Sequence, residues 1–187
     1  IPGPVTADGT VNRCVNLGWG VFNVSEALAR ISGFPVESAN DANVAALGEY
    51  WMGGGKGCKD MLFVTLGTGV GGAVIADGHL VAGAHGAGGE LGHMVINRDE
   101  PETCACGRRG CVQQYVSATG VVRVAKQYLA AHPEQPSAMR GAEKLTAKIV
   151  FDSAAAGDAA AQAALETVSD AFGFFLAAGC TVSDPEA

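Results

Sequence analysis

Met61-Leu-Phe-Val-Thr-Leu66 runs directly into Gly67-Thr-Gly-Val-Gly-Gly72, and this stretch decides the fold. Its first six residues are apolar or β-branched, which predicts a buried strand, and a second strand is expected at 73–76. Asp77-Gly78 is a turn pair, and 79–82 predicts a third strand. The stretch therefore predicts a three-stranded meander with a glycine-rich turn after its first strand.

The glycine-rich turn is a candidate anion site. Glycine lets the backbone come close to a ligand and turns several N–H groups toward it. No Lys-Ser/Thr pair follows, as a Walker A loop requires, and no helix opens after the glycines, as a dinucleotide fingerprint requires. Two interpretations stay open, a phosphate cradle and a plain glycine-rich hairpin.

Composition narrows the class of protein. The 187 residues include 27 glycines, 48% hydrophobic residues and 17% charged residues, which excludes a disordered chain. The net charge of -7 and the lack of a Lys/Arg run argue against a nucleic-acid surface. We expect no membrane span, because no apolar stretch approaches the ~20 residues that one requires, and no signal peptide at the start of the chain. We expect a cytoplasmic protein with no membrane association.

From both ends of the sequence, we expect this chain to be a piece of a longer protein. The sequence begins at Ile1 without a methionine. It stops soon after an alanine-rich helical pattern that has nothing following it to pack against. One or two compact lobes fit the length.

Capping and turn residues predict the other elements. Ser25 is expected to cap a short helix that ends at Gly33, and 35–39 is expected to form a short strand. Further elements are expected at 42–52 (helix), 94–96 (strand), 112–131 (helix) and 142–179 (two helices separated at Gly157-Asp158, with Asp158 capping the second). Strands followed by helices indicate an α/β or α+β lobe.

Asn40 and Asp41 lie where the expected strand meets the next helix. Strand ends often carry active-site groups in α/β sheets. A carboxylate there can accept a hydroxyl proton, and an amide can donate to and accept from a hydroxyl. However, Asp or Asn before a helix is more often a cap than a catalyst, so both interpretations stay open.

A tetrahedral structural zinc requires four nitrogen or sulfur ligands. The sequence offers this set in His93, Cys104, Cys106 and Cys111. The three cysteines lie in a polar, glycine-kinked loop, which argues against buried free thiols. Their clustering also argues against a secreted disulfide scaffold. The isolated cysteines are expected to be buried thiols: Cys14, Cys58 and Cys180. The other histidines are expected to be solvated or turn residues: His79, His85 and His132.

Four motifs in this order resemble the ROK family (repressor, open reading frame, kinase). They are Asn40-Asp-Ala-Asn-Val-Ala-Ala-Leu-Gly-Glu49, Leu66-Gly-Thr-Gly-Val-Gly-Gly72, Gly86-Ala-Gly-Gly-Glu-Leu-Gly-His93 and Cys104-x-Cys-Gly-x-x-Gly-Cys111. Asn16-Leu-Gly-Trp19 and Ser117-Ala-Thr-Gly120 also resemble segments of the family's bacterial glucokinases. The resemblance covers essentially the whole chain.

The resemblance implies an α/β fold, an actin-like ATPase (ribonuclease H-like) lobe with a mixed sheet, flanking helices and a zinc-bearing loop. Residues 1–187 would be mainly the larger, sugar-binding lobe, incomplete at both ends, with the sugar loop and zinc knuckle at 86–111. It also implies a glycolytic transferase that passes phosphate from ATP with Mg²⁺ to glucose or a related hexose. Because the family commonly forms dimers, a homodimer is expected.

The resemblance further assigns roles to single residues. Asp41 would be the general base, and Thr68 and Gly69 would face the ATP phosphates. Three residues would hold sugar hydroxyls: Asn40, Glu90 and His93. A structural zinc that shapes the sugar loop would be bound by His93, Cys104, Cys106 and Cys111.

One position departs from the family pattern. The family usually has a sugar-contacting Glu two residues after the last zinc cysteine, and here that place is Gln113. Gln113 is therefore expected at the sugar, and a single accepting oxygen predicts a weaker contact than a carboxylate makes.

Other functions stay open. The family motifs are shared by kinases for fructose, mannose and N-acyl hexosamines, and by repressors that bind a sugar as effector. A repressor needs a basic helix-turn-helix, which this acidic sequence lacks, and Asp41 favours catalysis. Neither the Asp-x-Gly-Gly-Thr first phosphate loop nor an adenine segment occurs, so we expect this chain alone to keep zinc but phosphorylate no sugar.

Overall fold

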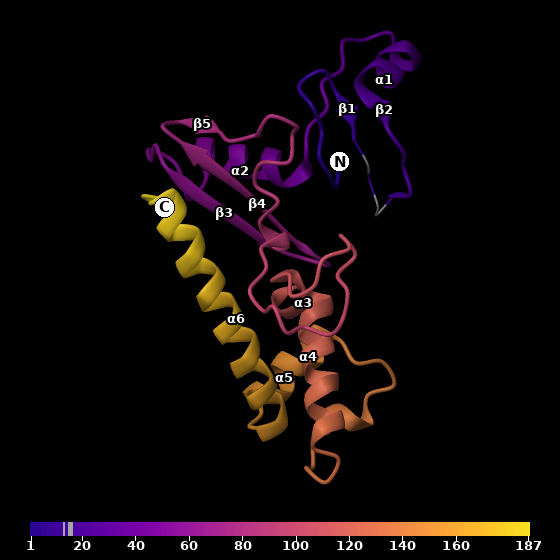
Figure 1. Ribbon diagram of the computed structural model, residues 1–187, viewed down its shortest axis with the longest axis vertical. Coiled ribbons are helices and arrows are strands. Elements are labelled where there is room, and N and C mark those ends of the chain that lie inside the picture. The colour runs from indigo at the N-terminus through magenta and orange to yellow at the C-terminus, as the bar shows by residue number, and fades with distance from the viewer. Residues whose placement is uncertain (13, 15–16) are drawn as a thin grey trace. The chain divides into compact units, whose positions relative to one another are not determined.

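The computed structural model describes residues 1–12, 14 and 17–187 (Figure 1). Its contacts divide the chain into two compact units. Unit 1 consists of Ile1–Val64, Gly72–Glu90 and Ser183–Ala187, and unit 2 of Thr65–Gly71 and Leu91–Val182. Asn16, the first residue of one of the family-like segments, lies outside the described residues.

Unit 1 begins with two short strands and a helix. Strand β1 (Thr10–Val11) pairs antiparallel with β2 (Phe22–Asn23), and α1 spans Val24–Ser32. The side chain of Asn23, and not of Ser25, caps α1, because Asn23 Oδ1 accepts a hydrogen bond from the backbone N–H of Glu26 at 2.7 Å. Gly33 ends the helix in the left-handed conformation, as expected.

The prediction of a strand at 35–39 is wrong, since no strand forms between Gly33 and Asn40. A strand requires a hydrogen-bonding neighbour, and here the contacts are confined to the end of the segment. The N-terminal amine of Ile1 donates to the Ala39 carbonyl at 3.0 Å, and Asp41 N donates to the Ile1 carbonyl at 3.1 Å. The segment is therefore an irregular connection into the next helix.

Unit 1 also contains a helix packed on the expected meander, of which residues 65–66 and 70–71 belong to unit 2. Helix α2 (Asp41–Met52) precedes β3 (Met61–Leu66), β4 (Val70–Ala76) and β5 (His79–Leu80), in the order β3-β4-β5. Their shared core consists of Ala46, Met61, Ala73 and Ile75, with Tyr50, Phe63 and Leu80 packed against it. The meander is thus confirmed. A mixed sheet was expected, and the described strands β4 and β5 pair antiparallel.

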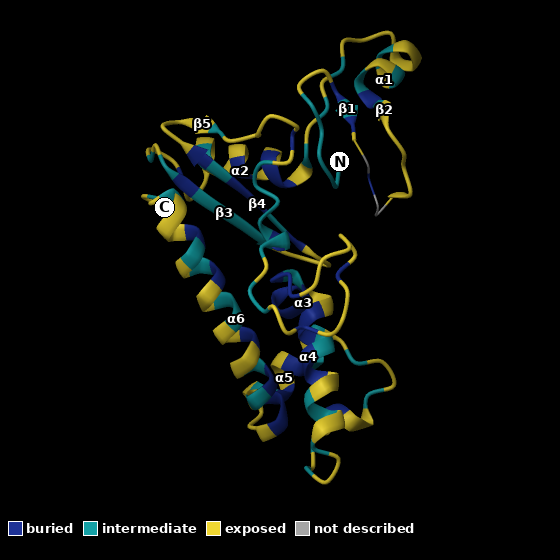
Figure 2. Cartoon of the chain, viewed as in Figure 1, coloured by how far each residue is buried: buried dark blue, intermediate teal, exposed yellow. Residues whose placement is uncertain are grey.

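Unit 2 is mainly helical. Its elements are η2 (Leu91–His93), α3 (Gln113–Val116), α4 (Ala118–Ala131), η3 (Ala138–Gly141), α5 (Ala147–Ala155) and α6 (Ala159–Ser183), the last residue of which belongs to unit 1. Helix α4 contacts α3 and α5 (Figure 1). Buried residues lie on α3 and the first half of α4, and also on α5 and α6 (Figure 2).

Two expected elements of unit 2 differ from the structure. The single helix expected at 112–131 divides at Ser117, which is extended and whose hydroxyl accepts from Gly120 N at 2.9 Å. Ser117 therefore caps a new helix, because a side-chain acceptor can replace the lost backbone partner. The strand expected at 94–96 is reduced to one bridge between Val95 and Cys111.

The helix pair near the C-terminus follows the prediction. Asp158 lies between α5 and α6, and its Oδ1 accepts from the backbone N–H groups of Ala160 and Ala161, both at 3.0 Å. Its Oδ2 accepts from Ser137 Oγ at 2.8 Å. Burial acts to raise the pKa of Asp158, but these hydrogen bonds outweigh it and lower that pKa. Asp158 is thus the predicted cap.

Helix α6 overturns one expectation. Its 25 residues have a mean hydropathy of 1.2 over an 18-residue window, so by length and composition the helix could cross a membrane. No stretch of that kind was expected from the sequence. A core helix of a soluble protein passes the same test, so this single helix is weak evidence for a membrane span.

Candidate functional site

Four possible metal ligands meet in unit 2. One ligand atom from each of His93, Cys104, Cys106 and Cys111 lies within 4.8 Å of the others. Cys104 Sγ is 3.8 Å from His93 Nδ1, and the sulfurs of Cys106 and Cys111 are 3.6 Å apart. The structure thus brings together the residues that the sequence predicts as zinc ligands.

A tight turn presents the first two cysteines. In this turn, residues 103–111 and here named the metal knuckle, Gly107 N donates to the Cys104 carbonyl at 2.8 Å and Cys104 N to the Arg108 carbonyl at 2.7 Å. Gly110 has a φ of 72°, and a Cβ added there would lie 1.6 Å from the Asn97 carbonyl oxygen. Glycine is therefore required at 110, where the knuckle returns to α3.

The cysteines differ in their electrostatics. Burial and the neighbouring thiols raise the pKa of Cys111 to about 12. Burial also acts on Cys106, but hydrogen bonds from the backbone and side chain of Arg108 outweigh it and lower the pKa of Cys106. A bound cation would supply the positive charge that releases the Cys111 proton. One nitrogen and three sulfurs fit a closed, structural zinc site.

A buried charge network that the sequence did not predict lies beside the knuckle. Glu100 is 4% exposed and forms an ion pair with Arg123 of α4. Tyr115 Oη donates to Glu100 Oε2 at 2.5 Å, and Asn97 Nδ2 donates to Tyr115 Oη at 2.9 Å. Arg123 also pairs with Glu102 at 3.2 Å. These residues fix the segment that leads into the cysteines, and no local spacing in the sequence reveals partners so far apart.

The ionisation of Glu100 reflects this network. Burial acts to raise the pKa of this carboxyl, but hydrogen bonds from Arg123, Tyr115 and the Glu102 backbone, with the Arg123 charge, outweigh it. The pKa of Glu100 falls from 4.5 to about 2. The carboxylate is therefore ionised at neutral pH, although it is buried.

The glycine-rich turn, residues 67–72 and here named the glycine loop, is held by the start of α4. Ala118 N donates to the Gly67 carbonyl at 2.8 Å, and Thr119 Oγ1 donates to the Thr68 carbonyl at 2.9 Å. Gly67 N donates to the Gly69 carbonyl at 3.0 Å. Thr68 and Gly69 are both exposed, which leaves the loop accessible to a ligand.

Asn40 and Asp41 open α2 in unit 1. Asn40 caps the helix, since its Oδ1 accepts from Asn43 N at 3.0 Å, and its Nδ2 donates to the Gly3 carbonyl at 3.1 Å. Asp41 is exposed, and its Oδ1 accepts from Ala42 N at 2.9 Å. The capping interpretation thus holds for Asn40, and the carboxylate of Asp41 is accessible.

The other predicted site residues divide between the units. Glu90 is partly buried and belongs to unit 1, whereas His93 is partly buried and belongs to unit 2. In unit 2, Gln113 Nε2 donates to Cys104 Sγ at 3.1 Å. Gln113 is therefore in contact with a predicted metal ligand, a contact that the sequence analysis did not expect.

The isolated cysteines are not alike. Cys14 is buried, as expected, and its thiol donates to the Pro2 carbonyl at 2.7 Å. Cys58 is half-buried, and Cys180 is exposed, so the expectation of a buried thiol is wrong for Cys180. Of the remaining histidines, His79 is exposed at the start of β5, with Nδ1 2.7 Å from the Asp77 carbonyl. His132 stacks on Tyr128 at the end of α4.

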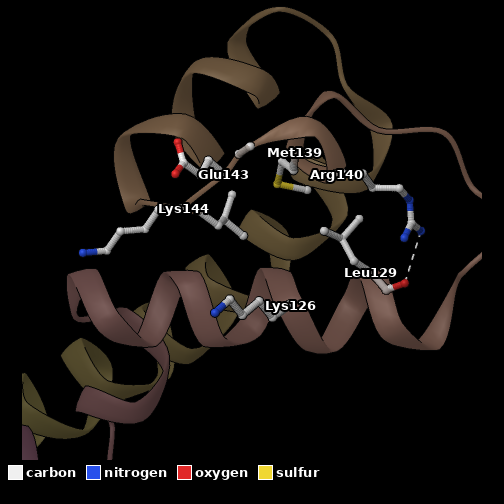
Figure 3. Close-up of a pocket in the computed structure, with 8 residues that line it drawn as sticks. Lys126, Leu129, Met139, Arg140, Glu143 and Lys144 are labelled. Carbon is white, nitrogen blue, oxygen red and sulfur yellow. Dashed lines mark hydrogen bonds between the residues drawn. The ribbon is translucent and has the colours of Figure 1, made fainter.

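One pocket of unit 2 lies between α4 and η3 with the segment that follows η3 (Figure 3). It is lined by Lys126, Leu129, Met139, Arg140, Ala142, Glu143, Lys144 and Leu145. The Arg140 guanidinium is used by the fold, because it donates to the carbonyls of Leu129 and His132 at 3.2 and 2.5 Å. None of the predicted site residues lines this pocket.

Comparison with known proteins identifies the family. The protein-family model described as "ROK family" matches residues 1–187 of the sequence. The chain belongs to the ROK family. A ROK family glucokinase from Streptomyces griseus, crystallised with glucose and AMPPNP, has a TM-score of 0.84 and 34% identity. The match covers 98% of this chain and 60% of that protein, which confirms the expected α/β fold of an actin-like ROK protein.

Sequence relatives of this ROK chain have several functions. A glucokinase from Halalkalibacterium halodurans is 39% identical over 99% of this chain and 57% of its own length. An N-acetylmannosamine kinase from Citrobacter koseri is 40% identical over 58% of the chain and 37% of that kinase, and a xylose repressor from Bacillus subtilis is 29% identical over 97% and 42%. The chain thus spans only 57% and 60% of the two glucokinases named above.

Proposed function

We propose that this ROK chain supplies the sugar-binding and second phosphate-binding parts of an ATP-dependent hexose kinase that makes glucose 6-phosphate. The match to the glucokinase crystallised with glucose and AMPPNP carries this proposal, because it extends over 98% of the chain. Residues 1–187 are proposed to form mainly the larger, sugar-binding lobe of that kinase. The kinase is proposed to be a cytoplasmic homodimer.

Asp41 is the proposed general base. Its carboxylate is exposed at the first residue of α2, where it can accept the proton of the attacking sugar hydroxyl. Phosphoryl transfer through a loose transition state asks the protein mainly for positioning and charge stabilisation. One base therefore suffices on this chain, with Mg²⁺ arriving bound to ATP.

The glycine loop is the proposed contact for the ATP phosphates, through Thr68 and Gly69. Both residues are exposed. The loop carbonyls of Gly67 and Thr68 accept from α4, which fixes the backbone before a ligand arrives. A preorganised loop can then direct N–H groups at the phosphates without reorganisation.

The proposed sugar contacts are Asn40, Glu90, His93 and Gln113. Asn40 caps α2 and bonds to Gly3, and its amide keeps one further N–H and one further lone pair for a hydroxyl. Gln113 Nε2 donates to Cys104 Sγ, so Oε1 is the side-chain atom that can accept a hydrogen bond from a sugar hydroxyl. For Asn40 and Gln113, the proposed contact uses an atom that retains hydrogen-bonding capacity.

His93, Cys104, Cys106 and Cys111 are the proposed ligands of a structural zinc. The donor set fits the metal, because the four ligand atoms lie within 4.8 Å of one another and two of the sulfurs belong to buried residues. When bound, the metal supplies a cross-link between η2 and the knuckle. Its proposed role is to hold the sugar loop at 86–111 and not to take part in the transfer.

Other functions are supported by particular relatives. The N-acetylmannosamine kinase supports an N-acyl hexosamine as substrate, and fructose and mannose are further candidates. The xylose repressor supports a sugar-responsive regulator. In a regulator Asp41 would have no proton to accept, so retention of this carboxylate favours the kinase.

The direct experiment is ATP consumption by the complete protein across a panel of glucose, mannose, fructose and N-acetylmannosamine. We expect the highest kcat/KM with glucose. No ATP consumption with any hexose, together with sugar-dependent DNA binding, would support the regulator. The 187-residue chain alone is expected to bind zinc and to show no turnover.

A further inference from the structure

Gln113 lies between the metal knuckle and residues 67–71 of the glycine loop, all within unit 2. Its Nε2 donates to Cys104 Sγ at 3.1 Å. Its Oε1 faces the glycine loop, because a Cβ added at Gly69 would lie 3.2 Å from that oxygen. One end of the amide thus contacts a predicted metal ligand, and the other end faces a predicted phosphate-binding residue.

The backbone of Gln113 connects the same two parts. Ser117 Oγ donates to the Gln113 carbonyl at 2.6 Å and lies 3.0 Å from Thr119 Oγ1. Thr119 Oγ1 in turn donates to the Thr68 carbonyl at 2.9 Å. Hydrogen bonds at both ends, joined by the Gln113 residue itself and by the close contact of the Ser117 and Thr119 hydroxyls, therefore link the Cys104 sulfur through the α3–α4 junction to the glycine loop.

We propose that Gln113 is a positioning residue that couples metal binding at the knuckle to the conformation of the glycine loop. This inference rests on the proposed metal and phosphate sites. A metal that fixes the Cys104 thiolate also fixes the amide that donates to it, since outer hydrogen-bond partners orient metal ligands. The coupling is reciprocal, so a ligand that orders the loop strengthens metal binding.

The amide is suited to this position in a way that a carboxylate is not. Gln113 Nε2 carries N–H donors for a sulfur acceptor, whereas an ionised Glu has acceptors only and would repel a thiolate. Because Gln113 stands where the family usually has Glu, the Cys104 sulfur accepts a hydrogen bond that a Glu could not donate. Gln113→Glu removes the donor at nearly constant shape, and Gln113→Leu removes both donor and acceptor.

The test compares the complete wild-type protein, Gln113→Glu and Gln113→Leu, with Gln162→Leu on the exposed face of α6 as the matched control. Zinc transfer to a chelator is measured first, and both Gln113 variants are expected to lose zinc 10–100-fold more readily. With Co²⁺ in place of zinc, the thiolate-to-metal absorption band is expected to shift in both. The control should match the wild type in each measurement.

Hydrogen exchange of the amides at 67–71 then tests the coupling. In the wild type, zinc removal should speed this exchange, and in zinc-loaded Gln113 variants exchange should match that of the zinc-free wild type. Wild-type zinc transfer and exchange in both variants would overturn the inference while leaving the metal site standing. Failure of the wild type itself to bind zinc would overturn the proposed metal site, and the inference with it.

Discussion

Arg123 of α4 forms an ion pair with the buried carboxylate of Glu100, in the segment that leads into the cysteines. The guanidinium also lies over the Tyr115 ring, 5.2 Å from its centre, and Tyr115 donates to the same carboxylate. Because a charge buried among several partners is costly to leave unpaired, this network fixes the approach to the metal knuckle.

The first prediction concerns acid stability. The folded pKa of Glu100, about 2, lies below its ordinary value of 4.5, so its contribution is full above pH 4.5 and is lost as the pH falls toward 2. The shift corresponds to about 3 kcal/mol of unfolding free energy. Urea unfolding of wild type and Glu100→Gln should show a stability difference that shrinks by this amount on acidification. A difference independent of pH would contradict the role of the network.

The second prediction uses two glycines of the metal knuckle. Gly107 and Gly110 have φ values of 87° and 72°, but only at Gly110 would a Cβ collide, with the Asn97 carbonyl. Gly110→Ala should therefore lower zinc affinity far more than Gly107→Ala, by at least tenfold, because the turn must open. Titration with a competing chelator measures this. Equal losses in the two variants would show that backbone strain, and not the close approach, decides the effect.

The third prediction separates the two roles of Asn40. Asn40→Ala removes the cap of α2 and should cost about 1 kcal/mol of unfolding free energy, whereas Asn40→Asp keeps an acceptor and should retain most of it. Both variants remove the amide N–H groups and are expected to raise the KM for the sugar. If Asn40→Asp has a wild-type KM, the amide makes no sugar contact through its nitrogen.

The periodic and capped elements could be predicted from the sequence, and the long-range contacts could not. β3 was predicted with its observed bounds. Asp158 was predicted as the N-terminal cap of α6 and Gly33 as the residue that ends α1, since these signals depend on neighbouring residues alone. The strand at 35–39 failed because a strand also depends on a partner elsewhere. The helix break at Ser117 was missed, although its hydroxyl is a common capping group.

The candidate site shows the same division. Three cysteines with a histidine close in sequence predicted a cluster, and the ligand atoms do meet. Residue spacing gives no sign that Glu100 pairs with Arg123, or that Gln113 donates to Cys104. Those contacts depend on how α3 and α4 pack against the loop, which only the tertiary structure defines.

Asp41 is proposed to accept the hydroxyl proton in an ATP-dependent hexose kinase, and the most direct test of that role is the turnover of Asp41→Asn in the complete protein. The amide keeps a hydrogen-bonding group but cannot take the proton, so kcat should fall by about 10²–10⁴-fold while glucose binding changes little. Glucose affinity measured by calorimetry on the same sample controls for folding. A kcat within a few-fold of the wild type would contradict the claim and leave Asp41 as part of the helix start alone.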